Sequence, residues 1–190
     1  ALHEAAVDGT IKGRIVGVIC DHHDAPVLQR AERWKVPATV IEMKTCRDKA
    51  DYNEKILEAA KSYAPDLICL AGYMRICGEN LIKAFENRII NVHPSLIPSF
   101  CGEGFYGLRV HEAALAKGVK VTGATVHFVS EVVDGGAIIA QKAVEVEDGD
   151  TPETLQKRVM QNAEWILLPQ AVSDFCAGRL RVDGAIVHKN

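Results

Sequence analysis

The chain has 190 residues, of which 48% are hydrophobic and 25% are charged, and its formal net charge at pH 7 is -3. This length and balance indicate one soluble globular domain with a sizeable core. The slightly acidic charge argues against a nucleic-acid-binding surface, and no segment approaches the about 18 consecutive apolar residues of a membrane span. The six cysteines form no CxxC pair, so we expect a cytoplasmic protein with free thiols, buried at Cys20, Cys69 and Cys77.

The first half of the chain alternates between β-branched apolar runs and segments with helical periodicity. We expect helices at residues 2–8, 25–34, 50–63 and 78–85, and strands at 14–20, 38–41, 66–72 and 88–92. Strands that alternate with helices at this spacing are typical of βαβ units. The prediction is therefore an α/β fold with an open, mostly parallel, twisted sheet flanked by helices.

The second half has a different character. A Pro-, Gly- and Ser-rich loop is expected at 93–107, and loops of this length are often functional. A helix should follow at 108–117, and then an antiparallel extension of the sheet with strands at 119–129 and 137–146. Thr151 and Pro152 are typical of a helix start, and this last helix should reach Cys176 with a bend near Pro169. Without a repeat or a linker, residues 1–190 are interpreted as a single domain.

Open parallel sheets often bind phosphate through a Gly-rich loop after their first strand. The sequence contains no such loop, and its first residues have the pattern of the helix that would follow one. We therefore expect a domain that lacks the first strand and its phosphate-binding loop.

The segment Asn91-Val92-His93-Pro94-Ser95 follows a buried strand and carries an amide, an imidazole and a hydroxyl. The imidazole of His93 can transfer a proton near neutral pH, and the amide of Asn91 can donate a hydrogen bond to an oxyanion. Taken alone, His93 is as consistent with a structural loop histidine as with a catalytic one, and Asn91 is more often a turn or capping residue.

Asp134 is the candidate partner of His93. It lies in the connection Ser130–Gly136, which is longer than a tight hairpin turn, although Asp-Gly alone commonly just forms a turn. A carboxylate bonded to His93 would favour the imidazolium and raise its pKa by roughly a unit or more. That shift would make His93 a better acid near pH 7.

Other candidates are ambiguous on their own. His127 in its apolar strand is at least as consistent with a buried structural histidine, and Glu164 with a solvated helix position. The segment Met74-Arg75-Ile76-Cys77 is, without context, a connection between a strand and a helix. The pair His22-His23 fits no standard zinc spacing, so no metal site is expected.

Four motifs carry a resemblance to a known family: Leu70–Ile76, Ile90–Pro98, Gly123–Val129 and Val133–Gly136. In this order and spacing they closely resemble glycinamide ribonucleotide transformylase, also called phosphoribosylglycinamide formyltransferase. The resemblance extends over essentially the whole chain. It implies a Rossmann-like formyltransferase fold that transfers a formyl group from 10-formyltetrahydrofolate, as co-substrate, to the amine of glycinamide ribonucleotide in purine biosynthesis.

The resemblance also implies residue roles. The family's catalytic trio falls on Asn91, His93 and Asp134. Its folate-binding residues fall on Asn91 again, on the segment Met74, Arg75, Ile76 and Cys77, and on Lys49, where arginine is more usual. Its substrate-binding positions fall on Glu164, for the amine, and His127. The chain departs from the family at the front, where the family has a first strand and a Gly-Ser-Asn phosphate loop, so these residues alone should bind glycinamide ribonucleotide poorly.

The implied mechanism is direct attack of the amine on the formyl carbon, without a metal or a covalent enzyme intermediate. Small-molecule substrates are the expected partners, with no nucleic acid or membrane, in a monomer or homodimer. Three alternatives stay open. Formyltetrahydrofolate deformylase shares the trio but has His where this chain has Pro94, and it carries a regulatory domain. Methionyl-tRNA formyltransferase adds an RNA-binding domain. A non-catalytic α/β ligand-binding module is the third.

Overall fold

The computed structural model describes all residues from Ala1 to Asn190. Its helices are α1 (Leu2–Val7), α2 (Pro26–Trp34), η1 (Met43–Thr45), α3 (Lys49–Ser62), α4 (Glu79–Ala84), α5 (Leu108–Lys117), α6 (Pro152–Val159), η2 (Met160–Glu164) and α7 (Trp165–Cys176). Its strands are β1 (Val18–Cys20), β2 (Ala38–Val40), β3 (Ile68–Leu70), β4 (Ile89–His93), β5 (Val121–Phe128), β6 (Ile138–Glu145), β7 (Leu180–Asp183) and β8 (Ile186–Lys189).

The strands form two sheets. β1 and β2 pair in parallel, and a second sheet has the order β3-β4-β5-β6-β8-β7. β3 and β4 are parallel, whereas β5 runs antiparallel to both β4 and β6. The expected α/β fold is confirmed, with parallel pairing in the first half and an antiparallel extension in the second.

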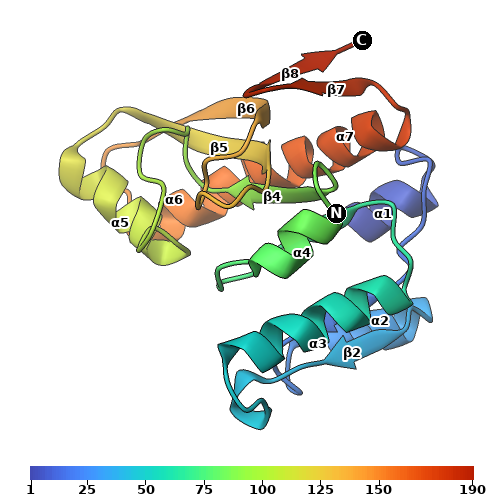
Figure 1. Cartoon of the computed structure of the whole chain (residues 1–190). Helices are drawn as coiled ribbons and strands as arrows, with labels where there is room; N and C mark the ends of the chain where they lie inside the picture. Colours follow the sequence, from blue (N-terminus) through green and yellow to red (C-terminus); the bar gives the residue numbers. More distant parts are fainter.

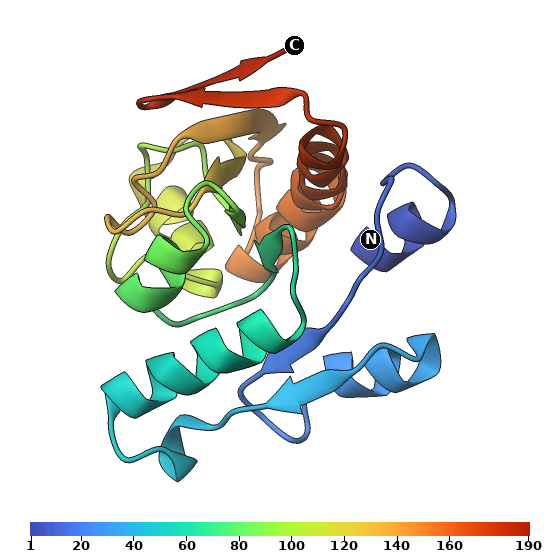
Figure 2. The same cartoon turned by 45° about the vertical axis from the view of Figure 1, so that its right-hand side comes forward.

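Two apolar clusters hold the layers together. One joins Ile90 and Val126 of the larger sheet to α6, η2 and α7, which run along one face of that sheet (Figure 1). The other gathers residues of α3 and α4, such as Tyr52 and Phe85, with Ile89 of β4. Figure 2 shows the β1–β2 sheet and α3 as a lower layer, and the larger sheet with α7 above it. Alternate residues of β4 therefore point to different clusters, as the pleat requires.

Local signals account for several element boundaries. The side chain of Asp48 accepts the backbone N–H of Asp51 and begins α3. Thr151 and Thr154 exchange the two hydrogen bonds of a capping box at the start of α6, with Pro152 at the first position. The predicted bounds of the helix at 108–117 are confirmed.

Other expectations need correction. The predicted strands at 14–20 and 66–72 shrink to three residues each. The last helix departs from α-helical geometry at the π-helical turn η2 rather than near Pro169, which lies inside α7. The hairpin of β7 and β8 was not predicted, although Asp183-Gly184 is a turn signal between its strands. The six cysteines are unpaired as expected, but Cys20, Cys69 and Cys77 are only partly buried. No helix is both long and apolar enough to cross a membrane.

Candidate active site

Asn91 and His93 lie on the same face of β4, because side chains two residues apart in a strand point the same way. Ile90, directly before Asn91, has no exposed surface and belongs to the core on the other face. Across the sheet, Asn91 pairs with His127 and His93 with Thr125. The pairing of β4 with β5 therefore places four polar side chains in one block at the carboxyl end of β4.

Asp134 reaches this block from the connection between β5 and β6. Its Oδ2 accepts a 2.9 Å hydrogen bond from the backbone N–H of Gly102 and lies 3.5 Å from His93 Nδ1. Its Oδ1 lies 3.7 Å from His127 Nε2. Burial opposes ionisation of this carboxyl, but the neighbouring imidazole of His127, the N–H of Gly102 and the imidazole of His93 outweigh it and lower its pKa below the ordinary value. Asp134 is thus an anion beside two imidazoles.

His93 is almost enclosed, with 4% of its side chain exposed. Its Nε2 lies 2.9 Å from the carbonyl oxygen of Phe100, which can only accept, so Nε2 carries a hydrogen. Burial lowers the pKa of His93, and the Phe100 carbonyl and the Asp134 charge raise it less than burial lowers it. The predicted contact with Asp134 is present, but the expected rise in the pKa of His93 is wrong, because desolvation outweighs the attraction.

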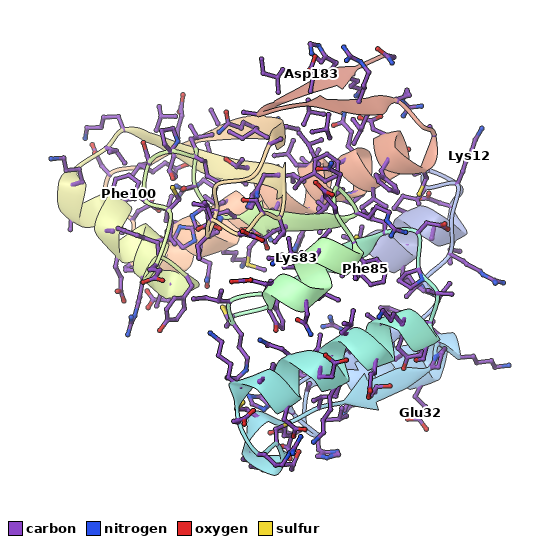
Figure 3. All side chains as sticks on the ribbon, viewed as in Figure 1. Lys12, Glu32, Lys83, Phe85, Phe100 and Asp183 are labelled. Atoms are coloured by element: carbon purple, nitrogen blue, oxygen red, sulfur yellow. The ribbon has the colours of Figure 1, made fainter.

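The loop 94–107 is fixed by bonds that sequence patterns do not reveal. The hydroxyl of Thr125 donates to the carbonyl oxygen of Ser95 at 2.7 Å and accepts the N–H of Ile97 at 3.1 Å. Gln141 of β6 donates to Thr125 and to the carbonyl oxygen of Ile97. These bonds and the Asp134–Gly102 bond hold the loop so that the Phe100 carbonyl faces His93. Figure 3 labels Phe100 on the side of the molecule where α5 lies.

The segment Met74–Cys77 follows β3, the neighbour of β4, and Leu70 pairs with Asn91. Met74 is 59% exposed and Ile76 49% exposed, so this segment offers apolar surface beside the block of polar groups. A Cβ on Gly107 would lie 3.4 Å from Met74 Cε, so Met74 borders the far end of the loop 94–107. Burial raises the pKa of Cys77 to about 11, so its thiol stays neutral at pH 7.

Arg75 and Lys49, the two basic candidates, differ in environment. The guanidinium of Arg75 lies 3.3 Å from Asp21 and 5.4 Å from the centre of the Tyr52 ring, which ties the segment to α3. Lys49 is an exposed residue at the start of α3. The structure joins it to none of the other candidates by a hydrogen bond or an ion pair.

Glu164 lies at the end of η2, whose Ala163 packs in the same apolar cluster as Ile90 of β4. Burial raises the pKa of Glu164 to about 7, and no cation is paired with it. π-helical turns are frequent at functional sites. Glu164 is thus a carboxyl that can exchange a proton near neutral pH, but no hydrogen bond joins it to the trio.

His111 of α5 is a buried residue that sequence analysis did not select. It has no exposed surface, and neither of its ring nitrogens has a hydrogen-bond partner. Burial and the charge of His93 lower its pKa to about 4. His111 therefore remains neutral close to the imidazole of His93.

This buried imidazole predicts an acid-sensitive fold. The folded-state pKa of His111 lies below the unfolded value near 6.5, so protons bind preferentially to the unfolded chain. Its stability contribution is present above that value and is lost as the pH falls towards 4. In His111→Leu we expect the loss of unfolding free energy between pH 6.5 and 4 to shrink by roughly 2–3 kcal/mol, measured by urea unfolding. His188→Leu, at an exposed position, is the control. If the unfolding free energy of both variants fell equally between pH 6.5 and 4, the assignment to His111 would be contradicted.

No group of three or more His, Cys, Asp or Glu side chains is arranged to hold a metal ion in the structure. The block described above instead combines an oriented amide, a buried imidazole, an anionic carboxylate and adjacent apolar surface. Such a set can stabilise an oxyanion and transfer a proton during acyl transfer.

Comparison with known proteins agrees with this chemistry. The family model described as formyl transferase matches residues 1–172. The chain belongs to the formyl transferase family. It is 43% identical over 142 residues to a phosphoribosylglycinamide formyltransferase of Bacillus subtilis, with 75% of this chain and 70% of the relative covered. It is 36% identical over 193 residues to a chloroplastic enzyme of the same name from Arabidopsis thaliana, with 100% of this chain and 65% of the relative covered.

A solved structure extends the match to three dimensions. Glycinamide ribonucleotide transformylase 1 from Symbiobacterium toebii superposes with a TM-score of 0.92 at 40% identity, covering 99% of this chain and 86% of that one. The chain thus spans most, but not all, of these family members, and about two thirds of the Arabidopsis relative. The formyltransferase fold inferred from the sequence motifs is confirmed.

Proposed function

We propose that this chain transfers the formyl group of 10-formyltetrahydrofolate to the amine of glycinamide ribonucleotide. The observation that carries the proposal is the assembly of Asn91, His93 and Asp134 into one block in a member of the formyl transferase family. The relatives named for this reaction are 36% and 43% identical, which supports the same substrates here.

In the proposed mechanism the amine attacks the formyl carbon and gives a tetrahedral intermediate with a negative oxygen. An amide N–H of Asn91 and the protonated imidazole of His93 stabilise that oxygen. Since burial lowers the pKa of His93, the new negative charge and Asp134 together provide the attraction that keeps it protonated. The attacking nitrogen loses a proton, the folate nitrogen gains one as it leaves, and the formyl carbon is transferred.

Substrate positions follow from the surroundings of the trio. The folate rings would lie against the apolar surface of Met74 and Ile76, beside Asn91 and Cys77. Arg75 and Lys49 would supply positive charge towards the folate carboxylates. Glu164, with a pKa of about 7, would hold the substrate amine and accept its proton near neutral pH.

The ribonucleotide phosphate needs a further element in this proposal. β1 and β3 each lack a second hydrogen-bonded neighbour, and Ile19 of β1 and Ile68 of β3 pack on the same apolar cluster. Central strands of a parallel sheet are normally buried on both faces, yet both of these strands are only partly buried. We infer that a further strand of the polypeptide preceding Ala1 joins these edges and that the loop after it binds the phosphate.

The direct test is an assay of formyl transfer with 10-formyltetrahydrofolate and glycinamide ribonucleotide. With the preceding strand supplied, turnover of roughly 1 s⁻¹ or more is expected. Residues 1–190 alone should show a higher KM for glycinamide ribonucleotide. Formation of tetrahydrofolate at the same rate without the amine substrate would instead support a deformylase. Binding without turnover of either kind would support the non-catalytic alternative.

A further inference from the structure

His127 is a buried imidazole whose hydrogen-bond partners define which ring nitrogen carries the hydrogen of its neutral form. Only 2% of its side chain is exposed. Its Nδ1 lies 2.8 Å from the backbone carbonyl oxygen of Phe128, and a carbonyl oxygen can only accept. The hydrogen of a neutral His127 therefore resides on Nδ1, which leaves a lone pair on Nε2.

That lone pair faces the amide group of Asn91. His127 Nε2 lies 3.2 Å from Asn91 Nδ2, a hydrogen-bond distance, whereas the nearest oxygen of Asp134 is 3.7 Å away. With Nε2 as the acceptor, Asn91 must present an N–H to it. The reverse orientation of the amide would place a carbonyl oxygen against a lone pair. His127 thus fixes which end of the Asn91 amide points towards β5.

The backbone fixes this pair as well. Asn91 and His127 lie directly opposite each other in the antiparallel pairing of β4 and β5. On the other side, the register of β5 against β6 shifts between Val126 and His127, which leaves Ile139 of β6 as an extra residue, an irregularity of the kind found beside active sites. Pairing with β4 and β6 therefore fixes the backbone of His127 on both sides, and its Nε2 faces Asn91.

We propose that His127 is a positioning residue that orients the Asn91 amide, so that the second N–H of that amide donates to the formyl oxygen in the transition state. This inference rests on the proposed formyl transfer. It assigns His127 a task other than direct contact with glycinamide ribonucleotide, because so little of its surface is exposed. Asn91 is the catalytic residue of the pair, and His127 acts through it.

Two conservative variants separate the two nitrogens of His127. In His127→Asn the amide lies near the former Nδ1, so the bond to the Phe128 carbonyl can persist while the acceptor for Asn91 is lost. In His127→Gln the amide reaches the level of Nε2 and can accept from Asn91. We expect His127→Asn to lower kcat by up to roughly 10²–10³-fold at little changed KM, the loss that follows removal of one oriented oxyanion donor, and His127→Gln to retain most of the rate.

A double-mutant cycle tests whether the effect passes through Asn91. In an Asn91→Ala background, His127→Asn should have no further effect on kcat. Independent rate losses in the double variant would overturn the proposal. So would equal kcat losses in His127→Gln and His127→Asn, full activity of His127→Asn, or a raised KM for the amine substrate at unchanged kcat.

A measurement without turnover separates this inference from the proposed function. Imidazole ¹⁵N NMR of the unliganded chain, recorded at a pH where the ring is neutral, should show the hydrogen of His127 on Nδ1. Hydrogen on Nε2 would overturn the inference even in an active enzyme. Absence of formyl transfer in the parent chain, with the Nδ1 form present, would instead contradict the proposed function and leave the hydrogen-bond assignment supported.

Discussion

Replacing His93 with alanine is expected to lower kcat for formyl transfer by roughly 10²–10⁴-fold, the usual contribution of a general acid. His93 is the group beside Asp134 that can place a positive charge at the developing oxyanion, and alanine leaves no proton donor there. KM for either substrate should change less than kcat, because the interaction is made chiefly in the transition state.

A fold defect must be separated from a catalytic one. His93→Ala also leaves the Phe100 carbonyl without its 2.9 Å partner, which costs about 1–3 kcal/mol when a buried group loses its hydrogen bond. Thermal unfolding of each variant therefore accompanies the rate measurement. His188→Ala, at a partly exposed position on β8, is the matched control and should retain full activity. Near-normal turnover in folded His93→Ala would remove His93 from the mechanism.

The pH dependence gives a second check on His93. Its pKa in the free chain lies below the ordinary 6.5, and its protonated form is the active one in the mechanism. The fraction of free enzyme in that form therefore falls as pH rises, which should lower kcat/KM on the alkaline side. The acid limb of the same profile should report deprotonation of the substrate amine or of Glu164.

Sequence patterns predicted the parts of the site that depend on strand periodicity and motif spacing. Asn91 and His93 could be placed on one face of a strand because they are two residues apart. The contact of Asp134 with His93 was also expected. The Phe100 carbonyl, the Gly102 N–H and the Thr125 hydroxyl were not, because the path of a long loop depends on tertiary contacts rather than on local residue preferences.

The sequence could not predict whether burial or a nearby charge dominates the pKa of a side chain in the site. It shows that a carboxylate reaches His93, but the direction of the pKa shift depends on how deeply the imidazole is buried. The same reason explains Glu164, whose raised pKa comes from burial, although its residue type and neighbours are typical of a solvated helix position. The partner of His127 likewise depends on the register of β4 against β5, which apolar alternation does not reveal.

Asp134→Asn is the second change with a large expected effect, a loss of kcat of roughly 10²–10⁴-fold at pH 7. Asparagine matches the carboxyl in size and tolerates the left-handed backbone at this position, where φ is 54°. It removes the negative charge that opposes the effect of burial on His93, so the pKa of His93 should fall further below its ordinary value. Less imidazolium is then available near neutral pH.

The pH profile of Asp134→Asn distinguishes this electrostatic role from a merely structural one. Because the variant loses protonated His93, its rate deficit relative to the parent should be largest near pH 8 and should narrow as the pH falls towards 6. The ionised Asp134 also stabilises the fold above its ordinary pKa, since its folded-state pKa is lowered, so a modestly lower melting temperature at pH 7 is expected. Asp148→Asn, at a fully exposed carboxyl, is the matched control. A deficit of equal size at every pH would show that Asp134 acts by holding the Gly102 loop rather than by keeping His93 charged.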